Sequence, residues 1–169
     1  MVIHIKILIV GIVACGKTTL AKRLSLENNI KYFELDSIVH DDYSNRKRNN
    51  NEQQDILKKI NKDNDDWIIE GTLRKNLYNL LHTASKIIYI DIPLHTRKKR
   101  ILWRFLKQKL GMEKSNYKPT LKMLKTMYKW TKDFEENKKN FEKVLKKYNK
   151  KLIILDTVSK VENYTLKLK

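Results

Sequence analysis

The sequence predicts an α/β fold of three layers, in which helices cover both faces of a five-stranded parallel sheet. Five short apolar runs, typical of buried strands, alternate along the chain with stretches of helical periodicity. A loop with two glycines follows the first run, and the later runs end in acidic residues. Since no linker or internal repeat interrupts the alternation, we expect a single domain over residues 1–169.

The loop at 11–19 reads GIVACGKTT and fits the pattern G-x-x-x-x-G-K-[ST] of a phosphate-binding loop. A β-branched run over 2–10 precedes it, and helical spacing over 18–26 follows, which is the context that such a loop requires. The glycines let the backbone approach a phosphate, and amides at a helix N-terminus attract negative charge. We therefore expect the phosphates of a nucleotide to be bound by Gly11, Ala14, Cys15, Gly16, Lys17, Thr18 and Thr19.

Two side chains of this loop have distinct predicted roles. Lys17 is expected to reach the β- and γ-phosphates and to act in catalysis. The hydroxyl of Thr18 is expected to coordinate Mg²⁺. The alternative, a glycine turn that binds nothing, is disfavoured by the strand and helix patterns on either side.

The rest of the chain continues the alternation of strands and helices. Pro93 is expected to stop the fourth strand, and Gly111 to end the long helix that follows it. Pro119 is expected to open a last helical segment that runs on to Tyr148. The predicted bounds of the other elements, in chain order, are strand 30–36, helix 52–62, strand 65–71, helix 73–81, strand 86–91, helix 95–110 and strand 151–156.

Three carboxylates at the ends of predicted strands are candidates for the site, because ligands bind at this edge of a parallel sheet: Asp36, Glu70 and Asp91. Glu70, which Gly71 follows, is predicted to lie on the metal side of the site. Asp36 is predicted to recognise the acceptor or act as base, because the polar segment 37–66 follows it. Capping of a turn or helix is the alternative for all three residues, and for Asp91 it is as good as catalysis.

The predicted helix 95–110 carries a basic pattern. Arg97, Arg100, Arg104 and Lys107 recur on one face, while Leu102, Phe105 and Leu106 are expected to pack on the body. A guanidinium group can donate two parallel hydrogen bonds to one phosphate. This face is therefore predicted to clamp phosphates as part of a lid at 97–118. In this interpretation Arg97 binds substrate, and Arg100 and Arg104 act in catalysis. An ordinary solvated basic face is an equal alternative.

Composition bounds the function without choosing it. The 37 lysines and arginines against 19 acidic residues give a formal net charge of +18, which attracts the phosphates of nucleotides and of nucleic acids alike. No apolar run reaches the roughly 18 residues of a membrane span, so no membrane partner is expected. The single cysteine excludes an internal disulfide and suits a cytoplasmic location. The N-terminus runs directly into the first strand, unlike a signal peptide.

Several motifs together resemble those of adenylate-kinase-like P-loop kinases: GKTTLAKRL at 16–24, LD at 35–36, WIIEG at 67–71 and IDIP at 90–93. The helix RKKRILWRFLK and the aromatic segment at 127–130 look closest to the DNA topology modulation proteins of that group. The resemblance implies a P-loop NTPase fold with a sheet of the nucleoside-monophosphate-kinase type and a helical lid. It also implies ATP and Mg²⁺ as cofactors.

The same resemblance implies roles for individual residues. Asp36, Glu70 and Gly71 would line the reaction centre, and Arg74 is similar to an acceptor-site arginine. Apart from the resemblance, the segment 37–66 is expected to bind the acceptor. Arg100 and Arg104 look like lid arginines. The sequence departs from adenylate kinases in having Glu70 in place of aspartate and TLR in place of FPR at 72–74, so the acceptor is expected to differ from AMP.

The leading prediction is a cytoplasmic small-molecule kinase that moves the γ-phosphoryl group of ATP to a hydroxyl or phosphate acceptor. The alternative is a nucleotide-dependent nucleic-acid-binding or regulatory protein, suggested by the net charge and by Trp103, Tyr128 and Trp130. No recognised nucleic-acid motif supports that alternative. An NTPase switch is a third hypothesis, and the N-K-x-D pattern that such switches carry is missing from the sequence.

Overall fold

The computed structural model describes residues 4–41, 44, 46–113 and 119–166. Its main sheet has five parallel strands in the order β2-β5-β1-β6-β7, which confirms the predicted fold class. β1 lies in the centre, and its last residues pair with the ends of β5 and β6, so three strand ends meet at one edge. The strands are β1 (Lys6–Gly11), β2 (Tyr32–Glu34), β5 (Trp67–Gly71), β6 (Lys86–Ile90) and β7 (Leu152–Leu155).

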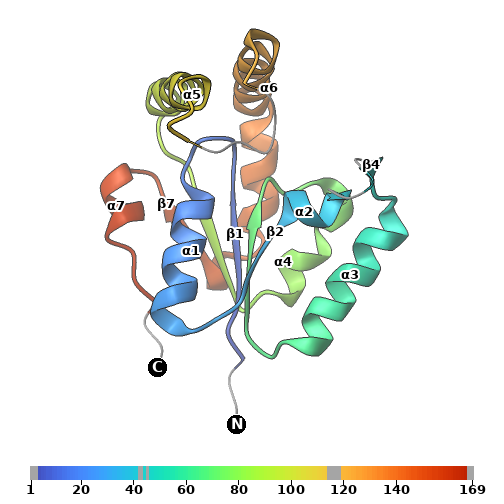
Figure 1. Ribbon diagram of the computed structural model, residues 1–169. Coiled ribbons are helices and arrows are strands. Elements are labelled where there is room, and N and C mark those ends of the chain that lie inside the picture. The colour runs from blue at the N-terminus through green and yellow to red at the C-terminus, as the bar shows by residue number, and fades with distance from the viewer. Residues whose placement is uncertain (1–3, 42–43, 45, 114–118, 167–169) are drawn as a thin grey trace.

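Helices cover both faces of this sheet, as Figure 1 shows. On one face lie α1 (Lys17–Asn28) and α7 (Val158–Glu162). On the other face lie α2 (Leu35–Val39), α3 (Asn50–Asp63), α4 (Asn79–Thr83) and the second half of α6 (Leu121–Lys146). α5 (Leu94–Lys109) and the first half of α6 stand beyond the carboxyl edge of the sheet (Figure 1). The smaller elements are the antiparallel pair β3 (His40–Asp41) and β4 (Arg46–Lys47), and the 3₁₀ turns η1 (Lys75–Leu77) and η2 (Asn149–Lys151).

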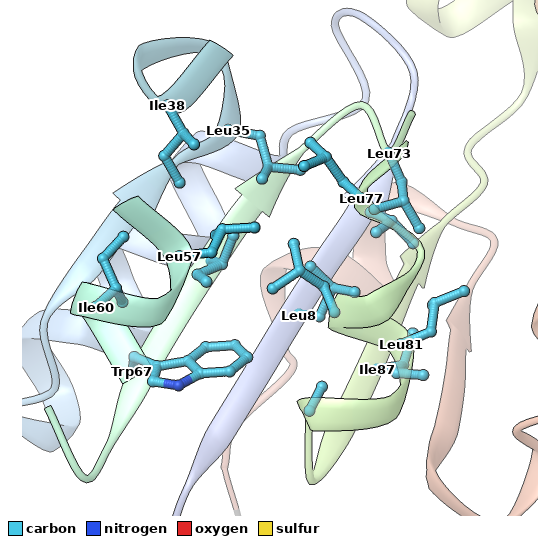
Figure 2. Packing of buried hydrophobic residues seen from close by; sticks show 14 of the residues in the cluster. Leu8, Leu35, Ile38, Leu57, Ile60, Trp67, Leu73, Leu77, Leu81 and Ile87 are labelled. Carbon is cyan, nitrogen blue, oxygen red and sulfur yellow. The ribbon is translucent and has the colours of Figure 1, made fainter. Parts of the chain in front are cut away.

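The core divides into two clusters because successive strand residues point to opposite faces. Leu8 and Trp67 face the layer of α2, α3 and α4, where Figure 2 shows them among leucines and isoleucines of those helices. Ile7, Ile9 and Ile68 face α1 instead. Each fully buried aliphatic or aromatic side chain contributes about 1.5–3 kcal/mol relative to exposure, so both layers hold the sheet firmly.

Three element boundaries differ from the prediction. β2 ends at Glu34 and α2 begins at once, so Asp36 lies in the first turn of a helix rather than at a strand end. The predicted helix 73–81 is divided into η1 and α4. The last segment is one helix of 26 residues, which Thr120 caps by accepting a hydrogen bond from the Met123 amide, so Pro119 precedes the cap.

Other boundaries follow local rules that the sequence carries. The asparagine run leads into α3, where Asn49 and Glu52 form a reciprocal capping box. Gly111 follows α5 with φ of 72°, the left-handed conformation that commonly ends a helix. Among the described residues, no helix is both long and apolar enough to cross a bilayer.

Candidate active site

The phosphate-binding loop joins β1 to α1 in the conformation that its glycines permit. A Cβ on Gly11 would lie 2.7 Å from Cys15 Sγ and 2.8 Å from the Ile90 carbonyl oxygen, so only glycine fits there. Gly16 (φ 105°) and Ala14 (φ 61°) adopt left-handed conformations, and together they turn the chain into the helix N-terminus. Loop amides and helix dipole thus combine at one concave edge, which suits a phosphate.

Lys17 arches back over this loop. Its Nζ donates a hydrogen bond of 2.9 Å to the Ile12 carbonyl and lies 3.9 Å from Cys15 Sγ. Since Lys17 is the first residue of α1, its ammonium group adds to the positive end of the helix. The positive charge of Lys17 therefore lies at the loop itself.

Thr18 and Glu70 meet on the α1 side of the sheet. The Thr18 hydroxyl donates a 2.7 Å hydrogen bond to Oε1 of Glu70, which β5 places beside β1. Glu70 is only 4% exposed, and this burial raises the pKa of its carboxyl, while the charge of Lys17 and the Thr18 hydrogen bond oppose the rise. A buried carboxylate beside a hydroxyl presents two oxygen atoms of the kind that Mg²⁺ prefers as ligands.

Glu34 is a neighbour of this pair that the sequence interpretation missed. It is the register partner of Glu70 across the β2–β5 ladder, and its charge, with that of Asp36, helps to raise the pKa of Glu70. The predictive signal would have been the strand order, because Glu34 reaches Glu70 only if β2 pairs with β5. Local sequence does not contain that pairing.

Asp36 and Arg74 lie together on the other side of the same edge. Arg74 Nη2 is 3.3 Å from Asp36 Oδ1, whereas Arg74 Nη1 is buried without a hydrogen-bond partner in the described part of the chain. The glycine at 71 allows α2 to lie this close to the end of β5, because an added Cβ at Gly71 would lie 2.6 Å from Cβ of Leu35 at the start of α2. Thr72, also missed, donates a 3.2 Å hydrogen bond to the Gly11 carbonyl and fastens the end of β5 to the loop.

The basic residues of α5 do not form the predicted stripe. Arg100 Nη1 reaches the Cys15 carbonyl at 3.4 Å, so it does lie over the phosphate-binding loop. Arg104 is exposed and paired with Glu113 at 3.0 Å. Arg97 is buried: its Nε donates to the Ile92 carbonyl, and its guanidinium pairs with Glu135 of α6.

The prediction that Arg97 lies with Arg100 on a phosphate-clamping face is therefore wrong. Of the three apolar side chains predicted to pack on the body, Phe105 is buried, whereas Leu102 and Leu106 are exposed. α6 lies along the side of α5 that carries Arg97 and Phe105, which turns Leu102 and Leu106 toward solvent. A buried guanidinium needs a partner, and Glu135 supplies it. Arg97 joins two helices and does not line the site.

The other predicted regions have clear places. Asp91 pairs with Lys138 of α6 at 2.7 Å, which attaches that helix to the end of β6. The segment 37–66 contains most of α2, the β3–β4 pair and α3. Within it, the Arg48 guanidinium donates hydrogen bonds to the carbonyls of Ser37 and His40. Of the predicted lid at 97–118, residues 114–118 lie outside the described part.

The strand order, the loop at 11–19 and the helix behind it define the class of protein as a P-loop NTPase. The sequence matches the AAA domain family over residues 7–119, more than half of the chain, and the protein belongs to this family. None of the curated proteins matches the sequence.

Two solved structures show the same fold at low sequence identity. A shikimate kinase from Bacteroides thetaiotaomicron is 12% identical, with a TM-score of 0.52 over 94% of this chain and 92% of that chain. An uncharacterized protein from Eubacterium ventriosum is 15% identical, with a TM-score of 0.53 over 94% of both chains. These similarities establish the architecture and leave the activity to be argued from the site.

Proposed function

We propose that the protein is a P-loop kinase that transfers the γ-phosphoryl group of ATP to a small-molecule acceptor. The observation that carries this proposal is the 2.7 Å hydrogen bond between Thr18 and buried Glu70, directly behind the phosphate-binding loop and Lys17. It puts together the cationic side chain, the hydroxyl and the carboxylate that phosphoryl transfer requires. One structural neighbour is a shikimate kinase, which supports this assignment.

The residues present suit Mg²⁺. The ion prefers oxygen ligands and keeps several waters, so one hydroxyl, one carboxylate and phosphate oxygens are a sufficient set. Thr18 and Glu70 would hold Mg²⁺, directly or through water, and the bound ion would neutralise charge on the β- and γ-phosphates.

Lys17 and the loop amides would bind the β- and γ-phosphates and stabilise the charge that spreads over the transferred group. An acceptor hydroxyl would form the new bond to phosphorus while the bond to the bridging oxygen of ADP breaks. Asp36 would take the hydroxyl proton, because its carboxylate is exposed at the same sheet edge. If the acceptor is a phosphate, no proton needs to be taken.

The acceptor would lie between Asp36 and Arg74. Within the described residues Arg74 Nη1 is buried without a hydrogen-bond partner, and an anionic group on the acceptor would supply one. Arg100, which reaches the Cys15 carbonyl, would need only a small side-chain movement to contact a phosphate in the loop. Arg104 would join it after leaving Glu113, and exclusion of water would suppress ATP hydrolysis without acceptor.

We further propose that the protein is related to the DNA topology modulation proteins, because of the motifs of α5 and of residues 127–130. We also propose that it is cytoplasmic. An acceptor other than AMP is proposed because of Glu70 and residues 72–74. Binding of nucleic acid remains the rival hypothesis, supported by the +18 net charge. Steeply salt-dependent binding of an oligonucleotide would favour that rival.

The test is production of ADP from ATP and Mg²⁺ with a panel of acceptors, compared between the native protein and Lys17→Ala. The panel contains nucleoside monophosphates, nucleosides, sugars and hydroxylated carboxylates, shikimate among them. Turnover that depends on one acceptor and is lost in Lys17→Ala is the expected result. Equal turnover with and without every acceptor would refute the kinase and favour an NTPase.

A further inference from the structure

The exposed large apolar side chains are concentrated in one part of the molecule. Nine are exposed in the described residues, and seven of the nine lie between positions 102 and 130, in α5, the turn after it and the first half of α6. Scattered exposed apolar residues are ordinary, whereas a concentration of them marks a contact surface. The seven are Leu102, Trp103, Leu106, Leu110, Met112, Leu121 and Trp130.

Four of these side chains form a stripe along α5, which we call the α5 stripe. It consists of Leu102, Trp103, Leu106 and Leu110, which are 44%, 62%, 41% and 73% exposed. At about 100° per residue, they project within roughly 100° of one another. The buried side of α5, with Ile101 and Phe105, lies on the opposite half of the helix. α5 is therefore apolar on two sides, and α6 covers only one of them.

The surroundings of the stripe are strongly basic. α5 has seven lysines and arginines and no acidic residue. Lys99 projects within the stripe, while Lys98 and Lys109 border it, and all three are exposed. Lys107 Nζ lies 5.7 Å from the centre of the Trp103 ring. Aliphatic side chains and a tryptophan between lysines are typical of a helix that lies at the surface of an anionic bilayer.

We propose that the α5 stripe docks on an anionic lipid surface. Leu102, Trp103 and Leu106 would enter the boundary between headgroups and acyl chains, with the lysines against the anionic headgroups. This surface contact is distinct from spanning the bilayer. Leu110, the last member of the stripe, directly follows α5. Together with the exposed side chains of Met112 and Leu121, it would extend the apolar contact beyond the end of the helix.

Two other occupants fit the observations less well. Nucleic acid would bind the lysines and the tryptophans, but five of the seven exposed side chains are aliphatic or thioether groups, which a phosphate backbone does not match. A second copy of the chain would bring two strongly basic helices together in a protein of net charge +18. An anionic bilayer satisfies both the apolar and the basic character.

The stripe is separate from the nucleotide site. Arg100, which reaches the phosphate-binding loop, projects about 100° away from the middle of the stripe. Docking therefore requires neither ATP nor the proposed kinase activity, and its test is independent of both.

The experiment is sedimentation of the full-length protein with vesicles of phosphatidylcholine, with and without about one third phosphatidylglycerol. We expect partitioning at least about tenfold stronger onto the anionic vesicles. The double variant Leu102→Gln/Leu106→Gln, which keeps the charge, should partition about tenfold more weakly. Leu26→Gln, at an 85% exposed position in α1, is the matched control and should bind like the native protein. Thermal melting checks that all variants are folded.

The proposal would be overturned by absence of binding to anionic vesicles, or by equal binding of the double variant, which would reduce the effect to net charge. It would also be overturned if the double variant lost binding of a single-stranded oligonucleotide rather than of vesicles. A dimer of the native protein that the double variant converts to monomer in ultracentrifugation would assign the stripe to a second copy instead.

Discussion

The Thr18 hydroxyl and the Glu70 carboxylate are joined by a 2.7 Å hydrogen bond across 52 positions of sequence. One residue comes from the first turn of α1 and the other from β5, and the pairing of β5 with β1 brings them together. Glu70 is buried and Thr18 is half-buried, and the charge of Lys17 acts on the Glu70 carboxylate. The geometry of the Thr18–Glu70 pair motivates the first prediction.

Glu70→Gln should lower ATP turnover in the presence of Mg²⁺ by about 10- to 100-fold, because an amide is a weaker metal ligand than a carboxylate. The amide oxygen can still accept the Thr18 hydrogen bond, so the fold should persist. Titration of turnover against Mg²⁺ concentration measures the effect, and a raised requirement for Mg²⁺ is expected. Unchanged dependence on Mg²⁺ would remove Glu70 from the metal site.

The same substitution gives a prediction about pH and stability. Burial raises the pKa of Glu70, so the folded protein holds the proton more tightly than the unfolded chain does. The stabilisation by this proton is complete below the unfolded pKa, about 4.3, and is lost as pH rises through the folded value. Urea unfolding should therefore show Glu70→Gln at least as stable as native protein at pH 7, with the difference shrinking toward pH 4. A variant that is markedly less stable at pH 7 would contradict this.

Arg97 and Glu135 should behave asymmetrically, because Arg97 is buried and Glu135 is partly exposed. Glu135→Leu leaves a buried guanidinium without its partner and should cost about 3 kcal/mol of unfolding free energy. Arg97→Met leaves a carboxylate that water can reach and should cost less. The double variant should recover most of the loss, and urea denaturation of all four proteins measures it. Equal costs for both single variants would refute the buried-charge explanation.

Gly71→Ala should destabilise the protein by about 2–3 kcal/mol, because the new Cβ would meet Leu35 Cβ at 2.6 Å. Gly111→Ala is the matched control: its φ is 72°, and no atom of the described residues lies within 4 Å of the added Cβ. It should cost only the roughly 1–2 kcal/mol of a left-handed backbone. Thermal melting compares the two, and a larger loss at Gly111 would contradict the packing argument.

Arg74→Met should raise KM for the acceptor about tenfold or more, because a charged hydrogen bond contributes about 1.5–3 kcal/mol. KM for ATP should stay within about twofold, since Arg74 pairs with Asp36 of α2 rather than with a residue of the loop at 11–19. The acceptor identified by the ADP assay is used for the measurement. A rise in KM for ATP alone would move Arg74 out of the acceptor site.

Much of the fold followed from local patterns. The loop at 11–19, the five strands and the end of α5 at Gly111 each have signals within a few residues of themselves. β2 is the partial exception: the apolar run suggested a strand to 36, but α2 begins at Leu35, whose side chain lies against Gly71 of β5. A contact between residues so far apart in sequence cannot be inferred from either segment alone.

The sequence by itself determined the strand–loop–helix unit and the presence of acids after the strands, because backbone conformation there depends on neighbouring residues and on glycine. Tertiary structure decided which residues meet. Strand order placed Glu34 beside Glu70, and the side on which α6 packs buried Arg97 while exposing Leu102 and Leu106. Helical periodicity shows which side chains share a face, but only long-range packing selects the face that is covered.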